Sequence, residues 1–75
     1  MSNVQAVRTP TSVRAERRRI GWNQLRLAIE SGVSLGTVRA AESRGPTAVR
    51  RTSLEKIATA LGLHVASFLP PEVRS

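Results

Sequence analysis

Apolar residues recur at helical spacing along most of this chain. Val13 and Ile20 lie seven residues apart on one predicted helix face, with the aliphatic stem of Arg17 between them. The clearest run has the spacing i, i+3, i+4, i+7 of a buried helical face and consists of Leu54, Ile57, Ala58 and Leu61. The alternation typical of strands is weak throughout. We therefore predict an all-α protein.

Helix caps and glycines divide the pattern into five short helices. Asn23 and Ser34 have side chains suited to cap a helix N-terminus, and Gly32 suits the left-handed turn that ends one. Thr52 and Glu55 have the spacing of a capping box. The predicted helices span residues 12–19, 24–31 and 35–43, a segment between Thr52 and Gly62, and residues 65–69.

The helices form one domain, predicted over residues 12–69. Residues 1–11 mix small and polar residues without a period, which predicts a flexible N-terminal arm. Pro70 and Pro71 end the last helix, and residues 70–75 are predicted to be a C-terminal tail. Residues 47–51 are predicted to be a basic loop between the third and fourth helices.

Charge adds the first functional indication. The 75 residues include twelve basic and five acidic side chains, a formal net charge of +7, and eleven of the basic residues are arginine. Such a balance favours a polyanion as partner, with nucleic acid as the first candidate, although a merely soluble arginine-rich surface is the alternative.

There is no Cys, which excludes disulfides and Cys-based zinc sites. No apolar run reaches membrane-spanning length and no signal peptide is recognisable, so we expect a cytoplasmic protein.

The two predicted helices over residues 24–31 and 35–43 are joined by a turn of about three residues. Small Ala28 allows the second helix to approach closely, and Gly32 permits the turn. Four residues are placed to fill the junction: Leu27, Val33, Val38 and Ala41. A rigid helix pair of this kind can present its second helix to the major groove of B-DNA.

The order of these features resembles the Cro and phage-repressor family of helix-turn-helix proteins, also called the xenobiotic-response-element type. The resemblance covers about residues 13–69. Its matching residues are Gly21-Trp22-Asn23-Gln24, Leu27-Ala28, Gly32-Val33-Ser34, Thr37-Val38, Glu42 and the segment 53–63. The resemblance implies a five-helix lambda-repressor-like domain, and it implies an internal structural pairing for Glu42.

The resemblance also implies a set of DNA-binding positions. Gln24 matches the position that grips a phosphate, and a helix N-terminus suits an anion there. Asn23 and Ser34, at the two helix starts, join this set. Three residues match the positions that read base edges, Leu35, Gly36 and Ala40, whereas Thr37 matches a position near the DNA backbone.

The residues at the three positions that contact base edges depart from the family pattern. Leu35, Gly36 and Ala40 carry no hydrogen-bonding side chain, which leaves Arg39 as the long polar residue on the predicted recognition helix. Arg39 could bind a guanine edge, bind a phosphate, or be a solvated charge. Leu35 could touch a thymine methyl group. We expect sparse base readout, with affinity from phosphates, DNA shape or the N-terminal arm.

Further arginines flank the predicted recognition helix. The resemblance implies that Arg44, Arg50 and Arg51 form a second phosphate clamp, with a merely soluble loop as the alternative. The run Arg17-Arg18-Arg19 is either a DNA-facing patch or a solvated surface.

Apolar residues outside the core pattern suggest a partner contact. Leu25 and Ile29 lie four apart on a different face from Leu27 and Ala28, so they form a subunit contact or else join the core through a rotated helix. Phe68 either packs the last helix down or joins a dimer contact. Trp22 is interpreted as a core anchor rather than a base-stacking residue.

Enzymatic function has little support in the residues. One His, no Cys and no Asp supply no nucleophile triad, and no glycine-rich phosphate loop is present. His64 is interpreted as a cap or surface residue. We expect no cofactor or metal, and a homodimer that binds double-stranded DNA as a transcription regulator, most simply a repressor. The alternative is an antitoxin-like or adaptor module that mainly binds a partner protein.

Overall fold

The computed structural model describes residues 10–70 of the protein. This part of the chain folds into four α-helices and two short 3-10 helices, and it contains no strand. The elements are α2 (Val13–Arg19), α3 (Gln24–Ser31), α4 (Leu35–Ser43), η1 (Pro46–Ala48), α5 (Arg51–Ala60) and η2 (Val65–Phe68). The prediction of an all-α fold is therefore confirmed for these residues.

The predicted boundaries of α3 and α4 are correct, because a side chain caps each helix at the expected residue. The Asn23 Oδ1 atom accepts a hydrogen bond from the Arg26 N–H at 2.7 Å, and the Ser34 hydroxyl accepts from the Thr37 N–H at 3.0 Å. Each bond satisfies an N–H group that a helix start leaves without an intrahelical acceptor. Gly32 ends α3 with φ of 75°, a left-handed conformation that favours glycine.

The predicted capping box is wrong. Helix α5 begins at Arg51, so Thr52 lies inside its first turn, and no side chain caps the helix at Arg50. Glu55 instead lies 3.6 Å from the Arg51 guanidinium, one turn away. The predicted loop over residues 47–51 is correspondingly shorter, because η1 occupies Pro46–Ala48 and α5 takes Arg51.

The fifth predicted helix is a single 3-10 turn, η2. His64 caps it by accepting the Ala66 N–H at Nδ1, which agrees with the interpretation of His64 as a cap. Only five residues separate that cap from Pro70, and proline cannot continue a helix. This segment is therefore too short for the α-helical hydrogen-bond ladder, and the described chain has four α-helices rather than five.

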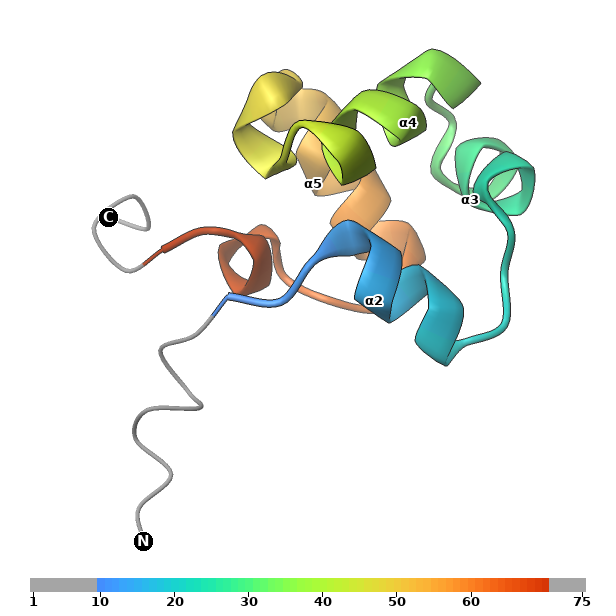
Figure 1. Cartoon of the computed structure of the whole chain (residues 1–75), viewed down its shortest axis with the longest axis horizontal. Coiled ribbons are helices and arrows are strands. Elements are labelled where there is room, and N and C mark those ends of the chain that lie inside the picture. Colours follow the sequence, from blue (N-terminus) through green and yellow to red (C-terminus); the bar gives the residue numbers. More distant parts are fainter. Residues whose placement is uncertain (1–9, 71–75) are drawn as a thin grey trace, which may run out of the picture.

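Helix α3 contacts both α4 and α5, and η2 packs against α5 (Figure 1). The apolar faces predicted from the spacing meet in one core. Its buried members are Val13, Leu27, Ala28, Val38, Ala41, Leu54, Ile57, Ala58, Leu61, Val65, Phe68 and Leu69. Val33, expected at the α3–α4 junction, is partly buried against this core. The core thus fixes the α3–α4 pair on a rigid support.

The two ends of the described chain lie side by side. The Thr11 N–H donates to the Ser67 carbonyl at 2.9 Å, which joins the start of the described segment to η2. The predicted arm and tail otherwise fall outside the described residues. None of the helices within residues 10–70 has the length and apolar character needed to cross a membrane.

Candidate nucleic-acid interface

Helix α4 lies at the upper edge of the molecule, with α3 beside it and α5 behind it (Figure 1). The turn from α3 to α4 consists of Gly32, Val33 and Ser34. The N–H groups of Gly32 and Val33 both donate to the Ala28 carbonyl, at 2.9 and 3.2 Å, which closes α3 tightly. Ser34 is extended and caps α4 at once. Along one face of α4, Gly36, Arg39 and Ser43 are exposed, and Thr37 and Ala40 are partly exposed.

A cleft of about 550 Å³ runs along that face, between α4 and the segment that leads into α5. Its lining contains four residues that the sequence assigned to DNA binding on α4 or its cap, together with two of the flanking arginines. The lining residues are Ser34, Gly36, Thr37, Ala40, Arg44, Ala48, Val49, Arg50 and Ser53. Six positions predicted separately from the sequence thus share one surface in space.

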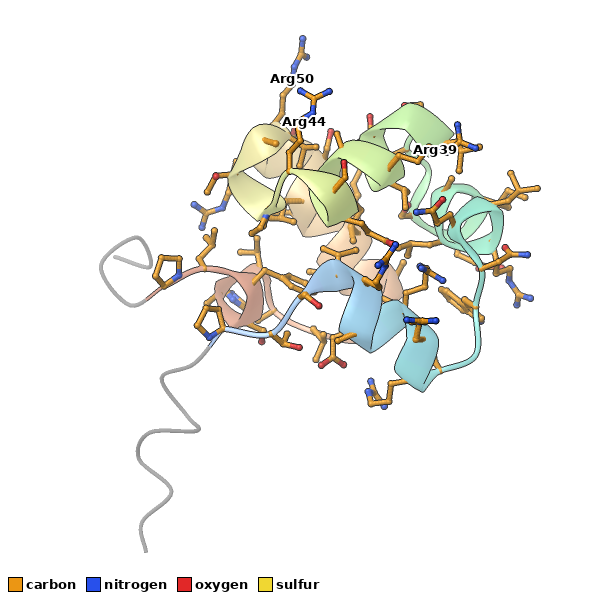
Figure 2. All side chains as sticks on the ribbon, in the orientation of Figure 1. Arg39, Arg44 and Arg50 are labelled. Atoms are coloured by element: carbon orange, nitrogen blue, oxygen red, sulfur yellow. The ribbon has the colours of Figure 1, made fainter. Side chains whose placement is uncertain are left out.

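Unneutralised positive charge gathers on this side of the molecule. Arg39, Arg44 and Arg50 lie on the side formed by α4 and the start of α5 (Figure 2). None of the three forms an ion pair within the described residues. In contrast, each described carboxylate lies within ion-pair distance of at least one arginine; these are Glu16, Glu30, Glu42 and Glu55. The α4 face is therefore locally cationic.

The short hydroxyl side chains of this face are engaged within the chain. The Ser34 and Thr37 hydroxyls lie 2.8 Å apart, and the Ser43 hydroxyl donates to the Arg39 carbonyl at 2.8 Å. Gly36 and Ala40 have no polar side-chain atom. Arg39 and Arg44 are consequently the long hydrogen-bonding side chains that α4 and its C-terminal cap present outward.

The four other predicted DNA-binding residues make contacts within the fold. Asn23 caps α3, and Gln24 donates its Nε2 hydrogen to the Glu42 carboxylate at 3.1 Å. Leu35 is partly buried against the core, so only part of its side chain faces solvent. Arg51 lies 3.6 Å from the Glu55 carboxylate and is the one arginine of the predicted loop with an acidic partner.

A buried ion pair joins α2 to α4 beneath this face. The Arg17 side chain is 10% exposed and that of Glu42 is 2% exposed. Arg17 donates to the two oxygens of Glu42, from Nε at 2.6 Å and from Nη2 at 3.0 Å, and its Nη1 donates to the Trp22 carbonyl. The internal pairing predicted for Glu42 is thus present. The idea of a surface patch over residues 17–19 is wrong for Arg17.

Opposing effects set the pKa of the Glu42 carboxyl. Burial raises it, but the hydrogen bonds from Arg17 and Gln24, with the charges of Arg17 and Arg14, outweigh burial. The net result is a pKa below the ordinary value of 4.5. The hydrogen bond to Glu42 raises the pKa of Arg17 despite its burial. Both groups are therefore charged at neutral pH, and the pair is a salt bridge.

The predicted contact residues divide into two groups. Leu25 and Ile29 are 55% and 66% exposed, which contradicts the alternative of a rotated, buried helix face. Phe68 is 1% exposed and belongs to the core, so its assignment to a dimer contact is wrong. Trp22 packs against the core, and the Arg26 guanidinium lies 5.0 Å from the centre of its ring. Only the α3 pair remains available to a partner.

The sequence did not predict the side of the cleft that faces α4, nor the ion pair between Arg17 and Glu42. Ala48, Val49 and Ser53 carry no pattern that would place them opposite α4. Arg17 and Glu42 are 25 residues apart, beyond any helical period. The pairing of Arg17 could have been predicted from its position between Val13 and Ile20 on the apolar helix face, because a buried arginine requires a partner for its charge.

Comparisons with known proteins give no assignment: no family model, curated protein or solved structure matches the chain significantly.

Proposed function

We propose that this protein is a helix-turn-helix transcription regulator of the lambda-repressor-like kind, which binds double-stranded DNA as a homodimer with α4 in the major groove. The observation that carries the proposal is the exposed face of α4, bordered by Arg39, Arg44 and Arg50, none of which has an acidic partner among the described residues. A helix with one free face and flanking guanidinium groups suits a groove lined by phosphates.

The small side chains of this face support a particular kind of recognition. Gly36 and Ala40 allow the α4 backbone to approach base edges closely, but they offer no hydrogen bond. Phosphate contacts then supply most of the affinity, and DNA shape supplies much of the selectivity. A two-fold arrangement of two such helices would add the affinity that one short helix lacks.

Fluorescence anisotropy with random duplexes and with the DNA upstream of the coding gene tests the proposal, repeated across a salt series. A regulator should prefer one duplex by about a hundredfold or more and should show a steep salt slope. Equal, weak binding to all duplexes would contradict sequence-selective regulation. Absence of binding to any duplex at low salt would contradict DNA binding altogether.

Replacing Arg39 by alanine separates base readout from backbone contact. The side chain is exposed on α4 and has no ion pair within the described residues, so its loss should leave folding intact. If Arg39 reads a guanine, Arg39→Ala relaxes the preference at one base pair by about 1–3 kcal/mol. If it binds a phosphate, affinity falls by the same factor on every duplex. An unchanged affinity on all duplexes would remove Arg39 from the interface.

A second function is favoured by the apolar pair on α3. Leu25 and Ile29 are the large apolar residues most exposed in residues 10–70, and adjacent exposed apolar side chains often mark a protein contact. On this view the protein is an antitoxin-like or adaptor module whose main partner is another protein. DNA binding would then be weak or would serve autoregulation.

Replacing both residues by aspartate tests this alternative. Leu25→Asp with Ile29→Asp should abolish the partner or subunit contact, because two charges cannot be buried unpaired in an apolar interface. Sedimentation gives the oligomeric state, and co-purification of a second protein with the unmodified and the variant chain gives partner binding. An unchanged oligomer and unchanged partner binding in the double variant would exclude a role for this pair in either.

A further inference from the structure

Arg14 is the outermost member of the cluster around Glu42. Its Nε atom lies 3.5 Å from Glu42 Oε1, and its side chain is 61% exposed. The same oxygen accepts hydrogen bonds from Arg17 Nη2 at 3.0 Å and from Gln24 Nε2 at 3.1 Å. Three donor side chains, from α2 and from the start of α3, therefore converge on one carboxylate oxygen of α4.

The charges of this cluster do not balance. Glu42 supplies one negative charge, and Arg17 neutralises it through two hydrogen bonds. The second guanidinium, Arg14, makes no hydrogen bond with another described residue and keeps its donors available to solvent. The cluster thus leaves one positive charge at the surface, beside Gln24 and the N-terminal end of α3.

The position of Arg14 links this charge to the proposed interface. Gln24 is the first residue of α3, the position at which the family resemblance implies a phosphate contact. Arg14 Nε lies 3.5 Å from the same Glu42 oxygen that accepts the Gln24 hydrogen bond, which places the Arg14 guanidinium beside the Gln24 side chain. A guanidinium matches a phosphate through paired N–H donors, which makes Arg14 a suitable second ligand there.

We propose that Arg14 binds a DNA phosphate beside Gln24, positioned by Glu42, so that α2 takes part in the interface through this one residue. The proposal rests on the proposed DNA-binding function and adds a contact to it. Glu42 then has two roles, because the carboxylate that secures Arg17 inside the fold also orients Arg14 and Gln24 at its surface.

The salt dependence of DNA binding tests this contact. Arg14→Ala should reduce the slope of log affinity against log salt by about one unit, and it should weaken binding by about the same factor on every duplex. Arg14→Lys keeps the charge and should restore the slope. Arg19→Ala is the matched control, because it removes an arginine of the same helix that pairs with Glu16 on another face.

The outcomes separate the two proposals. If the unmodified protein binds a random duplex and Arg14→Ala changes the slope no more than Arg19→Ala does, the Arg14 contact is refuted while DNA binding stands. If the unmodified protein binds no duplex, the proposed function itself fails. Thermal unfolding of each variant, followed by circular dichroism, shows whether a smaller salt slope results from loss of the folded structure. A folded Arg14→Ala variant whose salt slope equals that of the unmodified protein overturns the contact.

Discussion

Replacing Glu42 by alanine is expected to lower the free energy of unfolding by about 3–5 kcal/mol. The substitution leaves the buried Arg17 guanidinium without its carboxylate, and an uncompensated charge is costly at 10% exposure. Native domains are stabilised by only about 5–15 kcal/mol, and small ones lie toward the lower end. Urea unfolding at neutral pH, followed by circular dichroism, measures the change. A loss below about 1 kcal/mol would mean that water compensates Arg17 after all.

An apolar replacement of the pair distinguishes the charge from the packing. Arg17→Met combined with Glu42→Leu removes both charges and fills a similar volume, so it should restore most of the stability that Glu42→Ala loses. Gln24 also loses its acceptor in this variant, but that residue is only half-buried and can turn to solvent. If the double variant were as unstable as Glu42→Ala, the cost would come from packing rather than from the unpaired charge.

The same carboxylate makes stability depend on pH. The pKa of Glu42 is lower in the folded protein than its ordinary value of 4.5, so the folded state binds fewer protons than the unfolded state in this range. The resulting stabilisation is complete above pH 4.5 and is lost as the pH falls through the folded pKa. Unfolding curves of Glu42→Gln should consequently depend less on pH below 4.5 than those of the unmodified protein.

Local chemistry explains why the sequence predicted α3 and α4 so closely. Asn23 and Ser34 each need only a neighbour three residues away to cap a helix, and Gly32 needs only its own backbone freedom. These determinants lie within one turn of the residue concerned, so they can be recognised without tertiary information. The apolar spacing of α5 similarly identified its buried face, although not its first residue.

The errors arise where a tertiary contact decides the outcome. Thr52 and Glu55 satisfy the capping pattern, but the chain enters α5 at Arg51 after the η1 turn and places Thr52 inside the helix. Phe68 could have been a surface or a core residue until η2 folded against α5. Arg14 has no sequence signal, because its position depends on a carboxylate of another helix.

Reversing the charges of Arg44 and Arg50 is expected to weaken DNA binding by about a hundredfold or more at about 0.1 M salt. Both side chains border the α4 cleft and extend from the same side of the molecule (Figure 2). Neither has an ion pair within the described residues, so Arg44→Glu with Arg50→Glu removes two available cations and adds two anions facing the proposed DNA backbone. Anisotropy with a random duplex measures the loss directly.

Net charge alone could produce part of that loss, and a matched variant removes this ambiguity. Arg19→Glu with Lys56→Glu lowers the formal net charge by the same amount, on α2 and on α5 away from the α4 cleft. Phosphate contacts act over about one Debye length, roughly 10 Å at 0.1 M salt, so the matched variant should lose far less affinity. Equal losses of affinity in the two double variants would mean that DNA binding depends only on the net charge of the protein. A large difference would instead assign the phosphate contacts to the face that α4 shares with the start of α5.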